Sequence, residues 1–567
     1  MSTTQNQIVS ATVLLLAMSY TAVNAQSLAP SALTPTYLAP QTGDQRSLAA
    51  VLPPKGPPLA ESALSSMNVL VGQIQVDGGF AAQASATESI LSRYLGRRID
   101  AKKIYELAMA VEQMYTAAGF MLVRVVVPAQ ALVDGARLHL SVIDGYVENI
   151  DVRELPETVR AIVQIRLQPL VNRRGLTTSE IERCLLLAGE LPGVRLTSTL
   201  VPGSSLGSAR LIVAGTFEAF HGTLQIDNHL SRLEGPWQSA VTVAGNSLMG
   251  FGDQVYVYVS GSRPTNFSEI GRTLAIEGAG ASLPYGFDGS VINTEVTTSS
   301  THTAARQQVP ASAGLFKRAS VHWATPLVLT RSEREELSLG AETINQQLTL
   351  PDFSTVLQID DYQAARVKIS QDIAFNGGQT LTWSLGASRG IGGRGESSAA
   401  RSGVALSNSG ASPHFMTLNG KFENLISNNM IQVRSNATSQ WSFGHPVFTS
   451  EQFSLAGADS VSSFSSGDLQ VDSGVTARLA IEIASPVSFM QRRFLTTPYL
   501  FMAGGLGRDE QPAIGLAGPI RASSWGAGAR ASWSDAVQCV AEISRGASNS
   551  KGAESGLRTR ITLTGRF

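Results

Sequence analysis

The chain has few cysteines and few charged residues for its length. Its 567 residues include two cysteines, and 15% are Asp, Glu, Lys or Arg. Cys184 and Cys539 are far apart and lack the neighbours of a metal site, so we expect neither a disulfide nor a metal centre. Cys184 lies at helical spacing from Ile181 and Leu185, which predicts a buried, inert thiol. The formal net charge of −1 gives no indication of nucleic-acid binding.

Long hydrophobic runs are also missing beyond the N-terminus. No later stretch reaches the ~18 consecutive apolar residues typical of a membrane-spanning helix. Ile8 to Met18 is a shorter apolar run, and Val23-Asn24-Ala25 after it has the small residues of a cleavage site. A signal anchor is the alternative, and no Lys or Arg precedes the run. Because the run is shorter than the ~20 residues that a span needs, we expect a signal peptide over 1–25, cleaved after Ala25.

Residues 26–66 have the composition of a linker. They are rich in Pro, Ala, Ser and Gln and include Pro53-Pro54-Lys55-Gly56-Pro57-Pro58. Such a segment buries too little apolar surface to offset the entropy of folding. We expect a mobile linker, in which a short plug helix around Asp44 to Val51 is one option.

Residues 67–145 and 146–215 have the pattern of two α/β units in tandem. The first is predicted to contain a strand at Val69–Val76, a helix capped by Ser85–Glu88, a helix through Ile104–Met114 ended by Gly119, and strands at Leu122–Val127 and Ala136–Val142. The second is predicted to contain a strand at Val147–Val152, a helix within Pro156–Leu170, a helix capped by Thr177–Glu180, and strands at Val194–Val201 and Ala209–Ala214. This repeated order indicates two copies of one small domain.

Residues 216–567 contain roughly sixteen segments in which apolar and polar side chains alternate. In one of them, Leu479, Ile481 and Ile483 alternate with Ala480 and Glu482. A soluble β-sandwich array is the alternative. Only helices and closed barrels satisfy every backbone group in hydrocarbon, however, and no spanning helix is available. The fold class that we predict is therefore α+β domains followed by a C-terminal transmembrane antiparallel β-barrel of about 16 strands.

The final segment and several short motifs carry a family likeness. Leu557–Phe567 alternates up to a terminal aromatic, Phe567, which we interpret as a C-terminal barrel signal. The motifs are Gly119-Phe120, Val127-Pro128-Ala129-Gln130 and Gly145 in the first unit, Leu191-Pro192-Gly193-Val194 in the second, and Gly250-Phe251-Gly252-Asp253 in the barrel. In combination they resemble the ShlB/FhaC/HecB type of two-partner secretion transporter (the TpsB family), within the superfamily of the barrel-assembly protein BamA.

The resemblance implies the location and the domain types. It makes 67–145 and 146–215 two POTRA domains in the periplasm of a Gram-negative bacterium, and 216–567 a barrel in its outer membrane. It also implies a long sixth loop, about 444–472, folded into the barrel. The expected partners are a secreted exoprotein, outer-membrane lipid and the barrel assembly machinery, with no nucleic acid, and a monomer is expected.

The loop departs from the family pattern at the two ends of one ion pair. Family members carry Val-Arg-Gly-Tyr or Val-Arg-Gly-Phe in this loop, and its arginine pairs with the aspartate of a Phe-x-Asp-x-Gly strand. Here Ser462 and Ala503 take those two positions. Losing both partners can be nearly neutral, and we expect hydrogen bonds to hold the loop instead. The expected gating residues are Asp459, Val461, Ser462, Ser463 and Phe464, facing Phe501, Ala503 and Gly505.

The sequence gives no support to an enzyme. Gly203–Gly207 and Gly386–Gly390 match the Gly-x-Ser-x-Gly spacing but lack the strand-to-helix turn of a nucleophile elbow. The seven histidines are scattered, and Gly392–Gly395 lacks the Lys-Ser/Thr of a phosphate loop. We therefore expect no catalysis and no cofactor.

The function implied by the resemblance is secretion of a large exoprotein of the adhesin or haemolysin type. We expect the unfolded exoprotein to add a strand to exposed POTRA edges, although a neighbouring domain could cover those edges. The edge residues are Leu122, Val123, Arg124 and Val125 in the first domain and Val194, Arg195 and Leu196 in the second. The runner-up is a BamA-type insertion factor. A passive porin leaves residues 69–215 unexplained.

Overall fold

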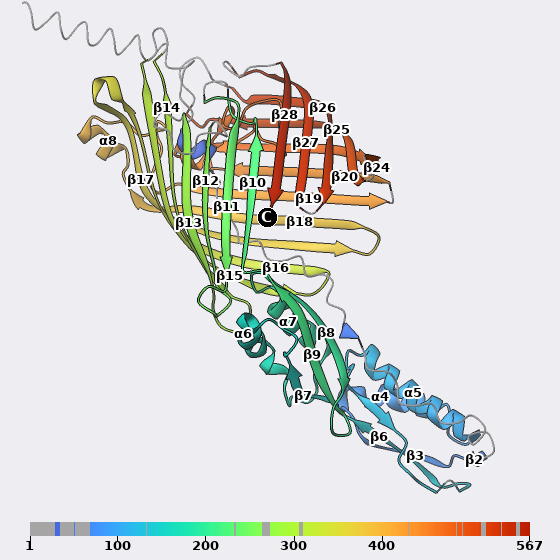
Figure 1. Cartoon of the computed structure of the whole chain (residues 1–567). Helices are drawn as coiled ribbons and strands as arrows, with labels where there is room; N and C mark the ends of the chain where they lie inside the picture. The colour runs from blue at the N-terminus through green and yellow to red at the C-terminus, as the bar shows by residue number, and fades with distance from the viewer. Residues whose placement is uncertain are drawn as a thin grey trace, which may run out of the picture.

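The computed structural model describes residues 29–34, 50–51 and 68–567, apart from 132, 232–233, 263–272, 306–309, 429, 484, 490–491, 512–517, 535 and 551–555. Two α/β domains extend in line from one rim of a β-barrel (Figure 1). The expected cleavage site at Ala25 and most of the expected linker lie outside the described residues. No helix among the residues described has the length and apolar character needed to cross a membrane.

The first α/β domain is built around one long helix. Its elements are β2 (Asn68–Leu70), β3 (Gln73–Gly78), the 3-10 helix η2 (Ala81–Gln83), α4 (Ala84–Leu91), β4 (Arg98–Asp100), α5 (Ala101–Ala117), β5 (Arg124–Val126) and β6 (Arg137–Ile143). The sheet order is β3-β6-β5, and β2 pairs with β4. Leu107 and Val111 of α5 are fully buried against the sheet.

Three local predictions in this domain are wrong. The single strand expected over Val69–Val76 is interrupted after Leu70 and forms β2 and β3, which belong to different sheets. α4 begins at Ala84 without a side-chain cap, so Ser85–Glu88 lies inside the helix and forms no capping box. The strand expected over Leu122–Val127 is limited to Arg124–Val126. Leu122 and Val123 precede it with both side chains buried, because they fill the domain cores instead of extending the edge.

The second α/β domain contains β7 (Tyr146–Asp151), α6 (Glu157–Leu167), η3 (Gln168–Leu170), α7 (Thr178–Gly189), β8 (Val194–Pro202) and β9 (Ser208–Phe217). The predicted capping box of α7 is confirmed, since Thr177 and Glu180 bond to each other's backbone. The sheet order is β1-β8-β9-β7. Strand β1 (Ala50–Val51) comes from the linker and pairs in parallel with Ser198 and Thr199 of β8. These two residues therefore form a strand, where a helix had been an option.

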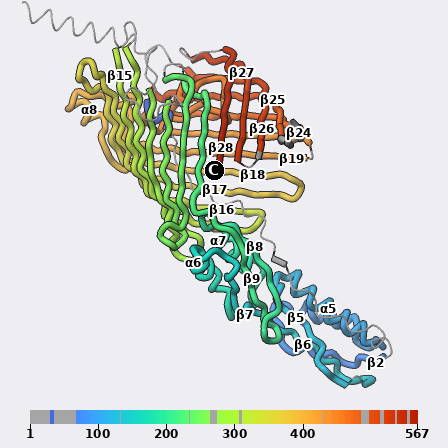
Figure 2. The backbone as a smooth tube through the Cα atoms, in the orientation of Figure 1, coloured from blue at the N-terminus to red at the C-terminus, as the bar shows by residue number. Residues whose placement is uncertain are grey.

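The rest of the chain closes into a barrel (Figures 1 and 2). Its strands are β10 (Phe220–Asp227), β11 (Gln238–Asn246), β12 (Gln254–Ser262), β13 (Leu274–Pro284), β14 (Val291–Thr303), β15 (Ser312–Leu329), β16 (Glu333–Leu350), β17 (Thr355–Phe375), β18 (Gln379–Gly393), β19 (Met416–Asn428), β20 (Ile431–Trp441), β23 (Ser473–Ile483), β24 (Ser485–Phe489), β25 (Arg492–Arg508), β26 (Ile520–Ser534), β27 (Val537–Ser548) and β28 (Leu557–Arg566). β23 and β24 both pair with β25 and count as one, so the wall has sixteen strands. β28 pairs with β10 to complete the ring, which confirms the predicted fold class.

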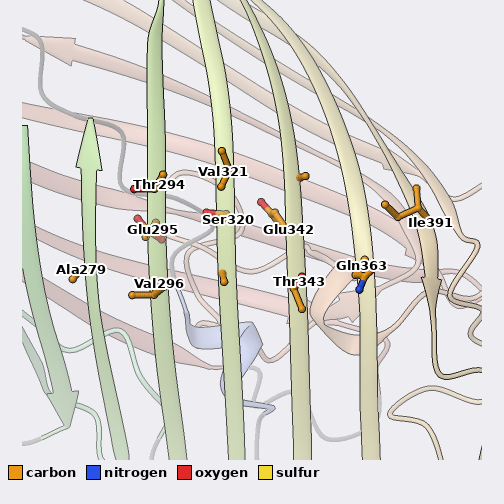
Figure 3. Close-up of a pocket in the computed structure, with 12 residues that line it drawn as sticks. Ala279, Thr294, Glu295, Val296, Ser320, Val321, Glu342, Thr343, Gln363 and Ile391 are labelled. Carbon is orange, nitrogen blue, oxygen red and sulfur yellow. The ribbon is translucent and has the colours of Figure 1, made fainter. Parts of the chain in front are cut away.

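The wall separates an apolar outside from a charged inside. On β23, Leu479 and Ile481 are 41% and 52% exposed, whereas Arg478 and Glu482, which flank them in sequence, are buried. Figure 3 shows another part of the wall, where a furrow of about 550 Å³ crosses β13 to β18. Alternate residues face opposite ways there: Val296 is exposed and Glu295 is buried. The period-two pattern therefore has the orientation that a membrane barrel requires.

The second α/β domain is fixed to the barrel rim. The Arg166 side chain of α6 donates to the carbonyl of Gly286 at 2.8 Å, and Arg183 of α7 donates to the carbonyl of Pro326 at 3.0 Å. Leu329 at the end of β15 is buried within the core of this domain. Glu190 forms an ion pair with Arg334 of β16. We call these contacts the rim joint.

Candidate functional site: the barrel lumen and the periplasmic edges

The long connection between β20 and β23, residues 442–472, folds back into the barrel. It contains η5 (Thr449–Glu451) and a hairpin of β21 (Phe453–Ser454) with β22 (Gln470–Val471). Leu455, Val461 and Phe464 are fully buried and pack with Ala522 of the wall. We call residues 456–466 the loop tip and residues 447–452 the loop base.

Arginines of the wall hold the loop tip through neutral oxygen atoms. Arg478 donates to the Ser462 hydroxyl at 3.0 Å and to the carbonyl of Ala458 at 3.1 Å. Arg560 donates to the carbonyl of Phe464 at 2.7 Å. Arg558 donates to the Ser465 hydroxyl at 2.6 Å. The tip therefore supplies acceptors and the wall supplies the positive charges.

A wall glutamate completes this arrangement. Glu542 of β27 accepts from Arg478 at 2.6 Å and from the Tyr499 hydroxyl at 3.0 Å. The Ser462 hydroxyl donates to the same carboxylate. Arg478 also lies over the ring of Phe501, 3.7 Å from its centroid. Sequence reasoning missed Arg478 and Glu542, because their alternation marked them only as inward-facing.

The structure explains why Ala503 can lack a carboxylate. Ala503 of β25 lies directly opposite Arg478 of β23 in the sheet register. Arg478 already has Glu542 as its partner, so an aspartate at 503 is not needed to neutralise it. Gly505 lies against Leu455 and Val461 of the loop, where an added Cβ would come within 3.4 Å of both. The predicted facing positions thus line the loop tip.

The other two polar residues predicted at the tip differ from each other. The Ser463 hydroxyl bonds to the Ser524 hydroxyl of β26 at 2.6 Å. Asp459 is exposed, and its carboxylate has no hydrogen bond or ion pair in the part of the chain that the structure describes. Ser462 and Ser463 are therefore brought to the wall, and Asp459 is not.

The loop base has a different chemistry. Arg366 of β17 forks onto the Glu451 carboxylate at 2.7 and 3.0 Å and also pairs with Glu342 of β16 at 2.8 Å. The Tyr362 hydroxyl donates to Glu451 at 2.7 Å. The Tyr362 ring stacks on Phe448, with centroids 4.4 Å apart. The base therefore carries an ion pair between loop and wall, whereas in the bonds between the tip and the wall only wall residues are charged.

A short N-terminal helix also lies in the lumen. Helix α2 (Pro30–Leu33) contacts η5, β14 and β15. Leu33 packs against a cluster of inward-facing side chains that includes Tyr256 and Tyr258. Pro30 lies so close to Gly314 that a Cβ there would clash with it. The lumen therefore holds two inserts, the loop and this helix.

The two predicted periplasmic edges differ in availability. On β5, the backbone N–H of Val125 donates to the Glu112 carboxylate at 3.0 Å, and Arg124 pairs with the same side chain at 2.9 Å. On β8, Val194 and Leu196 are buried and Arg195 is exposed. Its outer edge receives β1 of the linker. The edge of β8 thus already pairs with an added strand.

The remaining candidates from the sequence lack the surroundings of a catalytic or metal site among the residues described. Cys184 is half-buried against the core of the second α/β domain, and burial raises the pKa of its thiol. The two Gly-x-Ser-x-Gly matches lie at the β8–β9 turn and within β18. No group of three or more metal-type ligands occurs among the residues described.

Comparison with known proteins decides the family. Residues 211–531 match the family described as "Haemolysin secretion/activation protein ShlB/FhaC/HecB". The chain belongs to this family. Residues 69–145 match the ShlB-type POTRA domain. The barrel is accordingly an outer-membrane barrel with its POTRA domains in the periplasm.

Individual relatives of this ShlB-type chain are distant. The Heme/hemopexin transporter protein HuxB of Haemophilus influenzae is 22% identical over 179 residues, 31% of this chain and 32% of that protein. The match thus spans about a third of the relative's length. CdiB from Escherichia coli shares the fold with a TM-score of 0.69 and 17% identity, over 91% of this chain and 94% of that one. For CdiB from Acinetobacter baumannii the values are 0.61 and 14%, over 99% and 98%.

Proposed function

We propose that this chain is the transporter of a two-partner secretion system, which captures an unfolded exoprotein in the periplasm and passes it through the barrel. The observation that carries the proposal is the edge of β8, which accepts an extended strand. This edge lies next to a barrel whose lumen is occupied by the inward loop and by α2. The family match and the ShlB-type POTRA domain support it. The proposed cargo is a large exoprotein of the adhesin or haemolysin type.

Capture would take place mainly on β8. Strand addition uses backbone hydrogen bonds and makes little demand on sequence, which suits a long unfolded chain. The pairing of the linker strand β1 with Ser198 and Thr199 supports the β8 edge as the capture surface. The β5 edge is a weaker candidate, because Glu112 already uses the N–H of Val125. The exoprotein would therefore replace β1.

Passage would require the loop and α2 to leave the lumen. The wall left behind is polar, and several of its buried carboxylates are paired; Glu482, for example, accepts from Arg434 at 3.0 Å and from Arg530 at 2.5 Å. The sequence has no nucleotide-binding motif, so folding of the exoprotein outside the cell would drive movement.

Disulfide trapping tests the capture step. In a chain with Cys184→Ser and Cys539→Ser, Arg195→Cys places a thiol on β8, and Arg124→Cys is the matched probe on β5. The partner is the purified N-terminal secretion domain of the proposed exoprotein, with single cysteines along it. We expect trapping on β8 in preference to β5. Export of the exoprotein without trapping on β8 contradicts the proposed edge.

A deletion separates secretion from insertion of other barrels. Removing this gene should abolish export of the exoprotein and leave the amounts of other outer-membrane barrels unchanged. A general loss of those barrels would favour the insertion factor. The ShlB-type POTRA domain favours the first outcome.

Weakening β1 should strengthen binding of the exoprotein domain. Ala50→Pro with Val51→Pro removes two backbone N–H groups from the linker strand and disfavours its pairing with β8. Since the linker competes from within the same chain, we expect the Kd for the domain to fall by about threefold to tenfold, as fluorescence titration would measure. Ala50→Ser with Val51→Thr keeps both N–H groups and is the control. An unchanged Kd in the proline variant contradicts competition.

A further inference from the structure

One ion pair attaches the inward loop to the wall. Within residues 442–472, which are fully described, Glu451 is the side chain that forms an ion pair with a wall residue. Asp468 bonds to the backbone N–H of Ser465 inside the loop. Asp472, at the end of the loop, accepts from Val447 and from Gln452. Charge therefore joins the loop to the wall at the base.

The arginine at the centre of each attachment point keeps a wall carboxylate when the loop leaves. At the base, Arg366 is shared between Glu451 of the loop and Glu342 of the wall. At the tip, Arg478 retains Glu542. An unpaired buried charge costs several kcal/mol, and neither arginine would become one. Withdrawal of the loop therefore leaves Arg366 and Arg478 paired.

The two points differ in strength. Hydrogen bonds in which the donor or the acceptor is ionised are roughly twice as strong as neutral ones. In a forked arginine–carboxylate pair both partners are ionised, and the fork also fixes their orientation. Glu451 is buried, with an arginine fork and the Tyr362 hydroxyl on one carboxylate. At the tip, Arg478, Arg558 and Arg560 meet hydroxyl and carbonyl oxygens of the loop.

We propose that Glu451 is the positioning residue of the inward loop, and that its pair with Arg366 holds the loop in the lumen more firmly than the tip does. Breaking this pair frees the base, and the tip then releases through the loss of its hydrogen bonds to the wall and of the packing of Val461 and Phe464 against Ala522. The proposal rests on the proposed function only in that transport requires the loop to leave.

Loop release can be measured on the full-length protein without any cargo. Ala458→Cys, with Cys184→Ser and Cys539→Ser, places the sole thiol on an exposed position of the loop tip. In proteoliposomes, a polymer-bearing maleimide too large to enter the lumen labels this thiol only after the loop has left. The labelling rate then reports loop release, and loss of secretion with normal labelling would concern the proposed function alone.

Glu451→Gln is the decisive variant, because it keeps the shape and removes the charge. We expect its labelling rate to rise on the order of tenfold, and that of Ser462→Ala to rise about threefold or less. Glu482→Gln is the matched control: it neutralises a buried lumen glutamate held by Arg434 and Arg530 without touching the loop. We expect the control to be labelled at the rate of the unaltered chain.

Three results would overturn the proposal. The first is a labelling rate for Glu451→Gln equal to that of the unaltered chain. The second is a labelling rate for Ser462→Ala above that of Glu451→Gln. The third is a labelling rate for Glu482→Gln as high as that of Glu451→Gln, which would indicate general loosening of the barrel. Heat-dependent migration in detergent gels checks that each barrel is folded. If Glu451→Gln does not assemble, Glu451→Asp keeps the charge on a shorter arm and should give an intermediate rate; no increase there would also overturn the proposal.

Discussion

The barrel wall contacts the second α/β domain outside it and the loop inside it through two different kinds of interaction. At the rim joint, apolar burial adds to the polar contacts, because Leu329 of the barrel is part of the core of the second α/β domain. Arg166 is buried at the same joint and donates to a backbone carbonyl. In the lumen, by contrast, arginines of the wall meet hydroxyls, carbonyls and one carboxylate of the loop.

The difference separates a permanent contact from a reversible one. Apolar surface exposed by undocking costs about 25 cal/mol per Å², and no water bond replaces what is lost. Polar groups that separate can bond to water, so each contact contributes only ~1 kcal/mol net. The rim joint is therefore suited to hold the second α/β domain in place. The polar loop contacts are suited to open, whereas Leu455, Val461 and Phe464 of the loop resist opening through their apolar packing with Ala522.

The largest expected effect comes from the rim joint. Leu329→Ala should lower the free energy that docks the POTRA domain by about 2–5 kcal/mol, because it leaves a cavity in a shared core. Limited proteolysis of the connection between the second α/β domain and the barrel should cleave this variant faster than the unaltered chain. Leu327→Ala, at an exposed position two residues away, is the control. Equal cleavage rates for the two variants would show that burial of Leu329 does not hold the rim joint, and the contrast between the rim joint and the loop contacts would be lost.

Restoring the family's loop arginine should weaken the closed loop. Ser462→Arg adds a cation beside Arg478, which already forms a pair with Glu542. Repulsion should destabilise the closed loop by about 1–3 kcal/mol, seen as more frequent openings in planar bilayers. Adding Ala503→Asp, opposite Arg478, should reverse part of the loss. Fewer openings in the single variant would show that the wall can accept another arginine.

The smallest expected effect is a pH dependence of the rim joint. Burial holds the pKa of Glu190 above its ordinary value of 4.5, with Arg334 acting in the opposite direction. A carboxyl whose pKa rises on docking favours the docked state at low pH, and this contribution is lost as pH rises through the docked pKa. Docking should thus weaken by less than about 1 kcal/mol from pH 4 to neutrality. Glu190→Gln should flatten that change in thermal unfolding, and an identical pH profile in both chains would count against it.

Sequence patterns predicted more of the wall than of the site within it. Alternation on β23 placed Leu479 and Ile481 outside and Arg478 inside, because a strand's side chains alternate whatever lies beside it. The capping box at Thr177 was equally local and was confirmed. The one expected at Ser85 was wrong because the chain enters α4 at Ala84. Ser462 was identified as the departure from the family pattern, yet its partners were not.

What the sequence by itself determined about this protein is the kind of surface each strand presents and the order of its domains. Period-two alternation and helix caps depend on residues a few positions apart, so they are visible along the chain. The pairing of Arg478 with Glu542, the fork of Arg366 on Glu451 and the seating of β1 on β8 were decided by the tertiary structure alone. These contacts join residues dozens of positions apart, and only closure of the barrel and return of the loop bring them within bonding distance.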